Sequence, residues 1–348
     1  MSCQKCLAFL FFLLTAVPLH AQTGNIRQRA SFGLEGPVRK LRETVYISHN
    51  FRVDGLHFKE AEKSSVTGFS EMRFDSAGNM TYFHRFREYP FEDWTDSFEF
   101  DRQLHLVAQY GGASGMLTQR TSCRYNFLGQ LVAVRQLDDT GALFCETAYR
   151  YRGGLLSEEK TYSRAYVVIA ETDYSYDSLK RLVREEALWN PYRYSVPYVK
   201  EYAYDANGTL SCIRYLPREK KDWWTYRKSS DANGRICSES TYDASDSLLK
   251  IHNFRYGFRG RLVQEEADDG KIRQDIRYRY RKGRVHVVRN RFGDTDFRTF
   301  YLRYDSWGNW VEKAEYDGIN LQVTVREITY QPLKMKKTAP SRQSPAQR

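Results

Sequence analysis

Long hydrophobic stretches are nearly absent from this sequence of 348 residues. The exception is Leu7–Val17, an apolar run of 11 residues interrupted only by Thr15. A helix needs about 20 apolar residues to cross a bilayer, so this run is too short, and we predict no transmembrane segment. Apolar residues at helical spacing are also scarce, which argues against an α-helical fold.

The short apolar run has the features of a secretory signal. Lys5 supplies a basic start, and the run ends in Pro18-Leu19-His20-Ala21, which places a small residue at the cleavage point. We therefore predict a signal peptide over residues 1–21 and a mature chain from Gln22. The expected location is the periplasm, the cell surface or the extracellular space.

Motifs that carry catalysis or bind cofactors are missing as well. The sequence has no His-Glu-x-x-His, no Gly-x-Ser-x-Gly, no phosphate-binding Gly-Lys-Ser/Thr loop and no dinucleotide fingerprint. After residue 21 it has no Cys-x-x-Cys pair, which argues against a zinc site. We expect a protein that is not an enzyme and that holds no cofactor or metal.

Cysteine is scarce, and four remain in the predicted mature chain: Cys123, Cys145, Cys212 and Cys237. An even count in an exported protein suggests disulfides. The strand pattern argues against them. Cys123 and Cys145 are expected about 9–10 Å apart with one strand between them. Cys212 and Cys237 are expected on opposite faces.

Acidic residues are outnumbered, and the formal net charge is +11. The segment 331–348 contributes five of the basic residues and no acidic one. It is rich in Pro, Ser and Gln, so we predict a disordered basic tail there. The basic balance fits an anionic partner, but the favoured interpretation is solubility and the protection of an exposed sheet edge by Lys and Arg.

The main positive feature is a repeat. An aromatic, a polar turn ending at or near Gly, and an aliphatic recur at spacings of 26, 25, 26, 25, 28, 26, 26, 24 and 24 residues. The clearest copies are Tyr204–Leu210 and Tyr304–Trp310. The anchor positions are Phe74, Phe100, Tyr125, Tyr151, Tyr176, Tyr204, Ser230, Tyr256, Tyr280 and Tyr304.

Each repeat predicts one β-hairpin. The Asp-x-x-Gly segment fits a type I turn with a bulge, in which Asp bonds the backbone and Gly accepts positive φ. The glycines expected in this role are Gly78, Gly129, Gly208, Gly234, Gly260 and Gly308. A period near 25 residues holds two strands and two connectors.

The fold class predicted from this pattern is all-β: a long antiparallel meander of about ten hairpins over residues 70–330. Sheets of about twenty strands curl, so we expect a curled or partly closed sheet. Residues 22–69 are expected to supply N-terminal capping strands, notably Arg39–Ser48. In Arg277–Arg281 arginine and tyrosine alternate, which predicts tyrosines turned inward and arginines turned to water.

The pattern Tyr-x-Tyr-Asp-x-x-Gly-x-Leu resembles the repeat of the bacterial Rhs/YD-repeat family. The similarity covers about residues 70–316, and its best copies lie at 202–210, 254–262 and 302–310. In large members of that family the repeats form a hollow shell around a toxin. The resemblance implies a short secreted relative without the toxin and shell-plug domains.

Tryptophan marks the candidate binding residues, because all six tryptophans fall in or beside connectors. Aromatic side chains next to charged ones suit a sugar ring or a protein partner. The residues predicted to bind are Trp94, Trp189, Tyr192, Tyr194, Trp223 and Trp224. The alternative is that these aromatics fold back and plug the ends of the sheet.

The function expected from sequence is non-catalytic binding of a glycan or a protein at the bacterial envelope. The alternative is a structural component related to Rhs-type shells, which assembles through exposed sheet edges. Nucleic acid is not expected as a partner, because the strand alternation separates the tyrosines from the arginines of Arg277–Arg291. The sequence leaves the oligomeric state open.

Overall fold

The chain is built almost entirely of β-strands. The computed structural model describes residues 28–48, 51–54, 57–59, 63–88, 91–188, 197–217 and 223–332. One short 3-10 turn, η2, covers Arg29–Phe32. The strands are β1 (Val38–Ser48), β2 (Arg52–Asp54), β3 (His57–Lys59), β4 (Lys63–Phe74), β5 (Met80–Arg87), β6 (Glu92–Phe100), β7 (Leu106–Ala113), β8 (Met116–Tyr125), β9 (Leu131–Leu137), β10 (Leu143–Arg152), β11 (Leu155–Ser163), β12 (Val168–Tyr176), β13 (Leu182–Leu188), β14 (Tyr198–Tyr204), β15 (Leu210–Pro217), β16 (Trp224–Ser230), β17 (Ile236–Asp243), β18 (Leu248–Tyr256), β19 (Leu262–Asp268), β20 (Arg273–Arg281), β21 (Arg284–Phe292), β22 (Thr295–Tyr304), β23 (Trp310–Tyr316) and β24 (Leu321–Tyr330).

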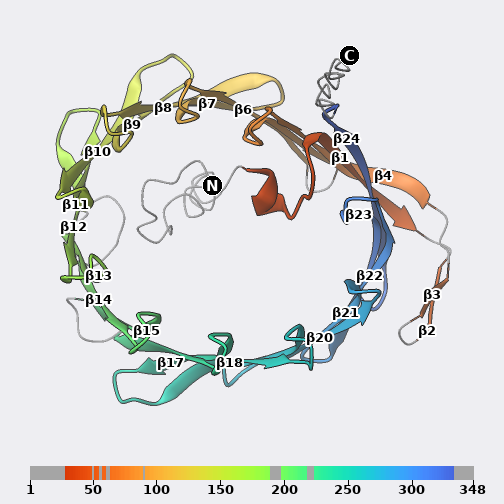
Figure 1. Cartoon of the computed structure of the whole chain (residues 1–348). Coiled ribbons are helices and arrows are strands. Elements are labelled where there is room, and N and C mark those ends of the chain that lie inside the picture. Colours follow the sequence, from red (N-terminus) through yellow and green to blue (C-terminus); the bar gives the residue numbers. More distant parts are fainter. Residues whose placement is uncertain are drawn as a thin grey trace, which may run out of the picture.

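The main sheet is a closed ring of 22 antiparallel strands (Figure 1). From β4 to β24 each strand pairs with its neighbours in sequence, so ten hairpins follow one another around the ring. β1 then pairs with β24 on one edge and with β4 on the other. β2 and β3 form a separate two-stranded sheet.

The prediction of a curled or partly closed meander is therefore wrong, because the sheet is a closed β-barrel. Twenty strands come from the ten hairpins, and β24 with β1 supplies the eleventh pair. The segment Arg39–Ser48, expected as a cap at one end of the sheet, lies in β1 and is hydrogen-bonded on both edges. The predicted signal peptide lies outside the described residues, as does the predicted tail from residue 333 onward.

The anchor tyrosines lie on the inner face of the barrel. One cluster of buried side chains includes Leu41, Phe74 and Phe98, with Phe32 and Leu34 of the N-terminal segment packed against it. Figure 1 shows this segment, in red, within the ring. The face that carries Phe74 is therefore the inner face, and the repeat places the tyrosine anchors at the equivalent positions.

The outer face has a smaller core of its own. Phe300, Ala314 and Val323 occupy neighbouring strands and are buried. Phe51 and Val53 pack against this cluster. Figure 1 shows β2 and β3 outside the ring, beside this part of the wall. The segment that contains Phe51 and Val53 thus covers this apolar cluster on the outer wall. Among the described residues, this is the only buried cluster on that wall.

The Asp-x-x-Gly turns share one geometry. In the turn at Asp205, the N–H of Asp205 donates to the carbonyl of Thr209 at 2.8 Å, and the N–H of Gly208 donates to the carbonyl of Asp205 at 3.0 Å. The Asp205 carboxylate accepts the N–H of Asn207 and of Thr209, at 2.9 and 2.8 Å. All six glycines named from sequence have positive φ: Gly78, Gly129, Gly208, Gly234, Gly260 and Gly308.

Consecutive hairpins are joined through the anchor tyrosines. The hydroxyls of six anchor tyrosines donate to a backbone carbonyl of the preceding hairpin, and four of these rings lie under an arginine of that hairpin. The hydroxyl pairs are Tyr125 to Leu106, Tyr151 to Leu131, Tyr204 to Leu182, Tyr256 to Ile236, Tyr280 to Leu262 and Tyr304 to Val285. The arginine pairs are Arg181 over Tyr204, Arg235 over Tyr256, Arg261 over Tyr280 and Arg284 over Tyr304.

Candidate functional site

A row of aromatic side chains lies along the inner wall between β14 and β16. The Tyr215 ring stacks on Trp224, with centroids 5.1 Å apart and planes at 14°. Its centroid lies 5.1 Å from that of Tyr198. Strand pairing explains the row. Tyr215 lies opposite Lys200 of β14 on one side and opposite Trp224 of β16 on the other, and Tyr198 lies opposite Pro217. Aromatic residues at facing positions of neighbouring strands pack in this way.

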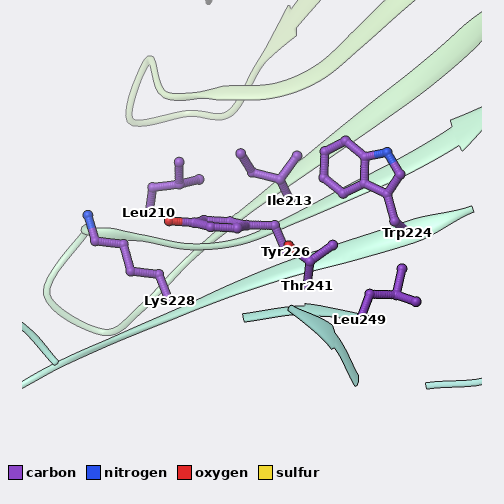
Figure 2. Close-up of a pocket in the computed structure, with 7 residues that line it drawn as sticks. All are labelled: Leu210, Ile213, Trp224, Tyr226, Lys228, Thr241 and Leu249. Carbon is purple, nitrogen blue, oxygen red and sulfur yellow. The ribbon is translucent and has the colours of Figure 1, made fainter. Parts of the chain in front are cut away.

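A cavity of about 510 Å³ adjoins the row on the same wall. Its lining comes from β15 to β18 and consists of Leu210, Ile213, Trp224, Tyr226, Lys228, Thr241 and Leu249. Figure 2 shows Trp224 and Lys228 at opposite ends, with the Tyr226 ring between them. The cavity therefore combines two aromatic rings and aliphatic side chains with one ammonium group and two hydroxyl groups, those of Tyr226 and Thr241.

A buried carboxylate supports the wall next to this cavity. Glu185 on β13 is buried and accepts the hydroxyls of Tyr198 and Tyr202, both at 2.7 Å. Lys200 donates to the same carboxylate at 2.9 Å. Tyr202 lies opposite Ile213 of the cavity lining. Three donors on one carboxylate fix the orientation of these side chains, as a buried charge requires.

The tyrosine hydroxyls of this wall stay protonated. Burial, followed by the charge of Glu185 and its hydrogen bonds, raises the pKa of both Tyr198 and Tyr202 well above the usual range. Burial and a hydrogen bond to Glu239 raise the pKa of Tyr226 in the cavity in the same way. The wall therefore offers neutral rings whose hydroxyls are held by carboxylates, which suits binding through ring faces.

The residues predicted from tryptophan spacing are only partly brought together. Trp224 lines the cavity, and Trp223 precedes it at the edge of the barrel. Trp94 lies on β6, on another part of the ring, where its indole N–H donates to Asp96 at 2.7 Å. Trp189, Tyr192 and Tyr194 lie outside the described residues.

Several wall residues were missed from sequence, among them Tyr198, Tyr215, Tyr226 and Lys228. Tyrosine occurs 26 times in the chain, so no single tyrosine stands out. The signal that could have found Tyr226 and Lys228 is their spacing of two and four from Trp224, which places all three on one face of a strand.

Metal-binding geometry and helical membrane spans are both missing from the described part of the chain. Across its ranges no group of three or more His, Cys, Asp or Glu side chains is placed to hold a metal ion. No helix in these ranges is long and apolar enough to span a membrane. Cys123, Cys145, Cys212 and Cys237 form no disulfide.

Comparisons with known proteins give similarities to solved structures alone. No family model and no curated protein matches the chain. A Tc holotoxin pore of Photorhabdus luminescens is 15% identical over 72% of this chain and 15% of that one, with a TM-score of 0.38. A TcdB2-TccC3 crystal structure is 12% identical over 78% and 18%, with a TM-score of 0.30.

A porin-like protein from Bacteroides uniformis ATCC 8492 is 9% identical over 85% of this chain and 99% of that one, with a TM-score of 0.33. This chain spans 15% and 18% of the length of the two Tc toxin chains above. At these identities and TM-scores we draw no functional argument from the similarities.

Proposed function

We propose that this protein is an exported, non-catalytic β-barrel that binds a carbohydrate on its inner wall at the bacterial envelope. The observation that carries the proposal is the cavity of about 510 Å³ between β15 and β18, with Trp224 and Tyr226 in its lining. Aromatic rings pack against the apolar faces of sugar rings, while a few polar groups fix orientation. Lys228, Thr241 and the hydroxyl of Tyr226 are the polar groups of this lining.

A carbohydrate fits this wall better than a folded protein does. Tyr226 lies opposite Ile213, and Ile213 lies opposite Tyr202, which shares a face with the anchor Tyr204. The cavity is therefore on the inner face, and a ligand must enter the ring to contact it. A glycan chain is narrow and offers a ring face and hydroxyls at every residue. The hydroxyls of Tyr198 and Tyr202 are held by Glu185, which leaves a rigid aromatic surface that loses little entropy on binding.

The repeat supports the related proposal that the chain is a relative of the Rhs/YD-repeat family. The alternative function, assembly through exposed sheet edges, gains no support from the closed sheet. β1 is paired on both sides, so the 22 described strands of the main sheet include no unpaired edge strand.

The test is a glycan array followed by titration of the glycans that bind. We expect Trp224→Ala to weaken the affinity at least tenfold, because it removes the largest ring of the cavity. The matched control is Tyr242→Ala, since Tyr242 follows Thr241 on β17, points to the opposite face and lies under Arg227. Unchanged affinity in Trp224→Ala would contradict the proposal, as would an array without any bound glycan. Far-UV circular dichroism confirms that both variants fold.

A further inference from the structure

A small dent in the wall of the barrel is framed by three arginines and one aspartate. Its lining consists of Asp275 and Arg277 of β20 and Arg289 and Arg291 of β21, and its volume is about 40 Å³. Arg277 lies opposite Arg289, and Asp275 lies opposite Arg291. Four side chains at facing positions of two neighbouring strands therefore surround one space.

The dent lies on the outer wall. Arg279 of β20 faces Val287, which belongs to the buried cluster of the outer wall. Arg277 is two residues from Arg279 and shares its face, whereas the anchor Tyr280 points to the inner face. The dent is therefore separate from the inner cavity lined by Trp224.

Both oxygens of the one carboxylate in the dent are engaged by protein donors. Asp275 accepts the Nε–H of Arg277 through Oδ2 at 2.9 Å. Its Oδ1 accepts a side-chain amide N–H of Gln264, a buried residue of β19, at 2.9 Å. Arg277 keeps the N–H donors of its two terminal amino groups.

The two arginines of β21 also keep unused donors. Arg289 donates from Nε and Nη2 to Asp296, at 2.9 and 2.8 Å, which fixes the plane of its guanidinium group and leaves Nη1. Arg291 is exposed and makes no hydrogen bond or ion pair with any described residue. The lining thus holds three guanidinium groups with N–H donors that the described part of the protein does not use.

We propose that this dent is a binding site for a terminal phosphate group, with Arg277, Arg289 and Arg291 as its donors. A guanidinium group presents its N–H donors in a planar fork that matches phosphate oxygens. A terminal phosphate group has three strong acceptor oxygens, one for each arginine, whereas a carboxylate has two.

The size of the dent suits such a group. One water molecule needs roughly 10–15 Å³ of space. A dent of about 40 Å³ therefore admits a group of a few atoms, while the rest of a phosphorylated molecule stays in solvent.

The local charge agrees with a dianion. Four arginines and two aspartates occupy adjoining positions of β20, β21 and β22: Arg277, Arg289, Arg291, Arg298, Asp275 and Asp296. They leave an excess of two positive charges, and a terminal phosphate brings about −1.5 to −2 at pH 7. Glu266 of the neighbouring β19 is balanced by Arg273, whose guanidinium group lies 3.9 Å from it. An anion in the dent also relieves the repulsion between facing arginines.

Calorimetric titration of the protein with inorganic phosphate tests the proposal, at low salt because salt screens exposed charges. We expect one phosphate per chain. Arg291→Gln should weaken binding at least tenfold, because it removes charge-assisted hydrogen bonds. Arg291→Lys keeps the charge but loses the fork, so it should restore only part of the affinity. Because Arg291 has no partner among the described residues, both variants should unfold at the same temperature as the unsubstituted protein.

Arg124→Gln is the matched control. Arg124 is exposed on β8, precedes the inward anchor Tyr125 and makes no ion pair among the described residues, so this variant removes the same charge from another part of the outer wall. Phosphate affinity should not change. Trp224→Ala should also leave it unchanged, which separates this site from the glycan proposal.

Three probes distinguish the sources of the phosphate group: inorganic phosphate, glucose 6-phosphate, and phosphatidylcholine vesicles that contain phosphatidic acid. The probe that binds most tightly, with affinity that depends on Arg291, assigns the site to the free ion, to a phosphorylated sugar or to a lipid headgroup. Absence of phosphate binding at low salt would overturn the proposal. An equal loss of affinity in Arg124→Gln and Arg291→Gln would do the same, because it would show attraction by net charge alone.

Discussion

At the scale of single residues, the recurring requirement is one left-handed position in each turn. Glycine meets it at Gly208, where φ is +79°. Lys180 occupies the same place one repeat earlier, with φ of +62°. A side chain in this conformation costs roughly 1–2 kcal/mol. The Asp177 carboxylate, which accepts the N–H groups of Leu179 and Arg181, helps to hold the strained turn.

The first prediction compares these two turns. Gly208→Ala should lower the free energy of unfolding by about 1 kcal/mol. A new Cβ would meet nothing closer than Arg181 at 3.7 Å, so the loss is conformational rather than steric. Lys180→Gly should raise the free energy of unfolding, because relief of strain exceeds the added entropy of the unfolded chain. Urea titrations measure both changes.

Ala206→Gly is the control for this pair, since Ala206 lies in the same turn as Gly208 without positive φ. It adds chain entropy and relieves no strain, so it should destabilise slightly. A Lys180→Gly variant that loses as much stability as Ala206→Gly would refute the strain argument.

At the scale of elements, neighbouring strands are held by side chains as well as by backbone pairing. On the outer face, Arg289 of β21 lies between Arg277 of β20 and Arg298 of β22. Like charges at facing positions repel, so this row needs anions. Asp296 supplies one: it accepts bonds from Arg289 at 2.8 Å and from Arg298 at 2.7 Å.

The second prediction concerns the pH dependence of this contact. Burial raises the pKa of Asp296, but hydrogen bonds from Arg289 and Arg298 outweigh burial and bring the pKa to about 2. A pKa below that of the unfolded chain stabilises the fold above about pH 4, and this contribution is lost as the pH falls toward 2. Asp296→Asn should therefore cost about 1–2 kcal/mol at pH 6, after allowance for screening.

Denaturant titrations at several pH values should show the two proteins converging between pH 4 and pH 2. Asp294→Asn is the control, because Asp294 is exposed in the adjacent turn. A stability gap for Asp296→Asn that stays constant down to pH 2 would contradict the proposed ion pairs.

The sequence predicts the individual strands and turns of this fold better than it predicts the closure of the sheet into a barrel. The Asp-x-x-Gly pattern finds turns such as Asp205–Gly208 because their signal is local. No local feature of Arg39–Ser48 distinguishes a strand that caps one end of the sheet from a strand that closes the sheet into a barrel. Its partners include Arg326, whose guanidinium lies 2.7 Å from Glu43 across 283 residues of sequence. Trp224 was found because tryptophan is rare, whereas Tyr215 was hidden among many tyrosines.

At the scale of the whole molecule, one strand decides whether the sheet is a ring. Leu41 of β1 is 1% exposed and lies opposite Ile328 of β24 and Met72 of β4. The remaining strands pair only with their neighbours in sequence. A substitution that destabilises the seam therefore has no direct contact through which it could destabilise strands on the far side of the ring.

The third prediction follows from this arrangement. Leu41→Asp buries a charge at the seam and should cost more than about 3 kcal/mol locally. Amide hydrogen exchange should accelerate in β1, β4 and β24, while β13–β16 keep their protection. Val168→Asp, at an exposed site on β12, should leave all these rates unchanged. Equal acceleration around the entire barrel would show that the ring unfolds as one cooperative unit.

Closure at the seam also makes the strand pairing of the barrel independent of the order of the strands along the chain. The N–H of Gln331 donates to the carbonyl of Pro37 at 2.8 Å, so the two ends of the barrel sequence meet. A short linker between them and a cut in any Asp-x-x-Gly turn would give a circular permutant with every strand pair retained. Strand neighbours, rather than strand order, are what this architecture encodes.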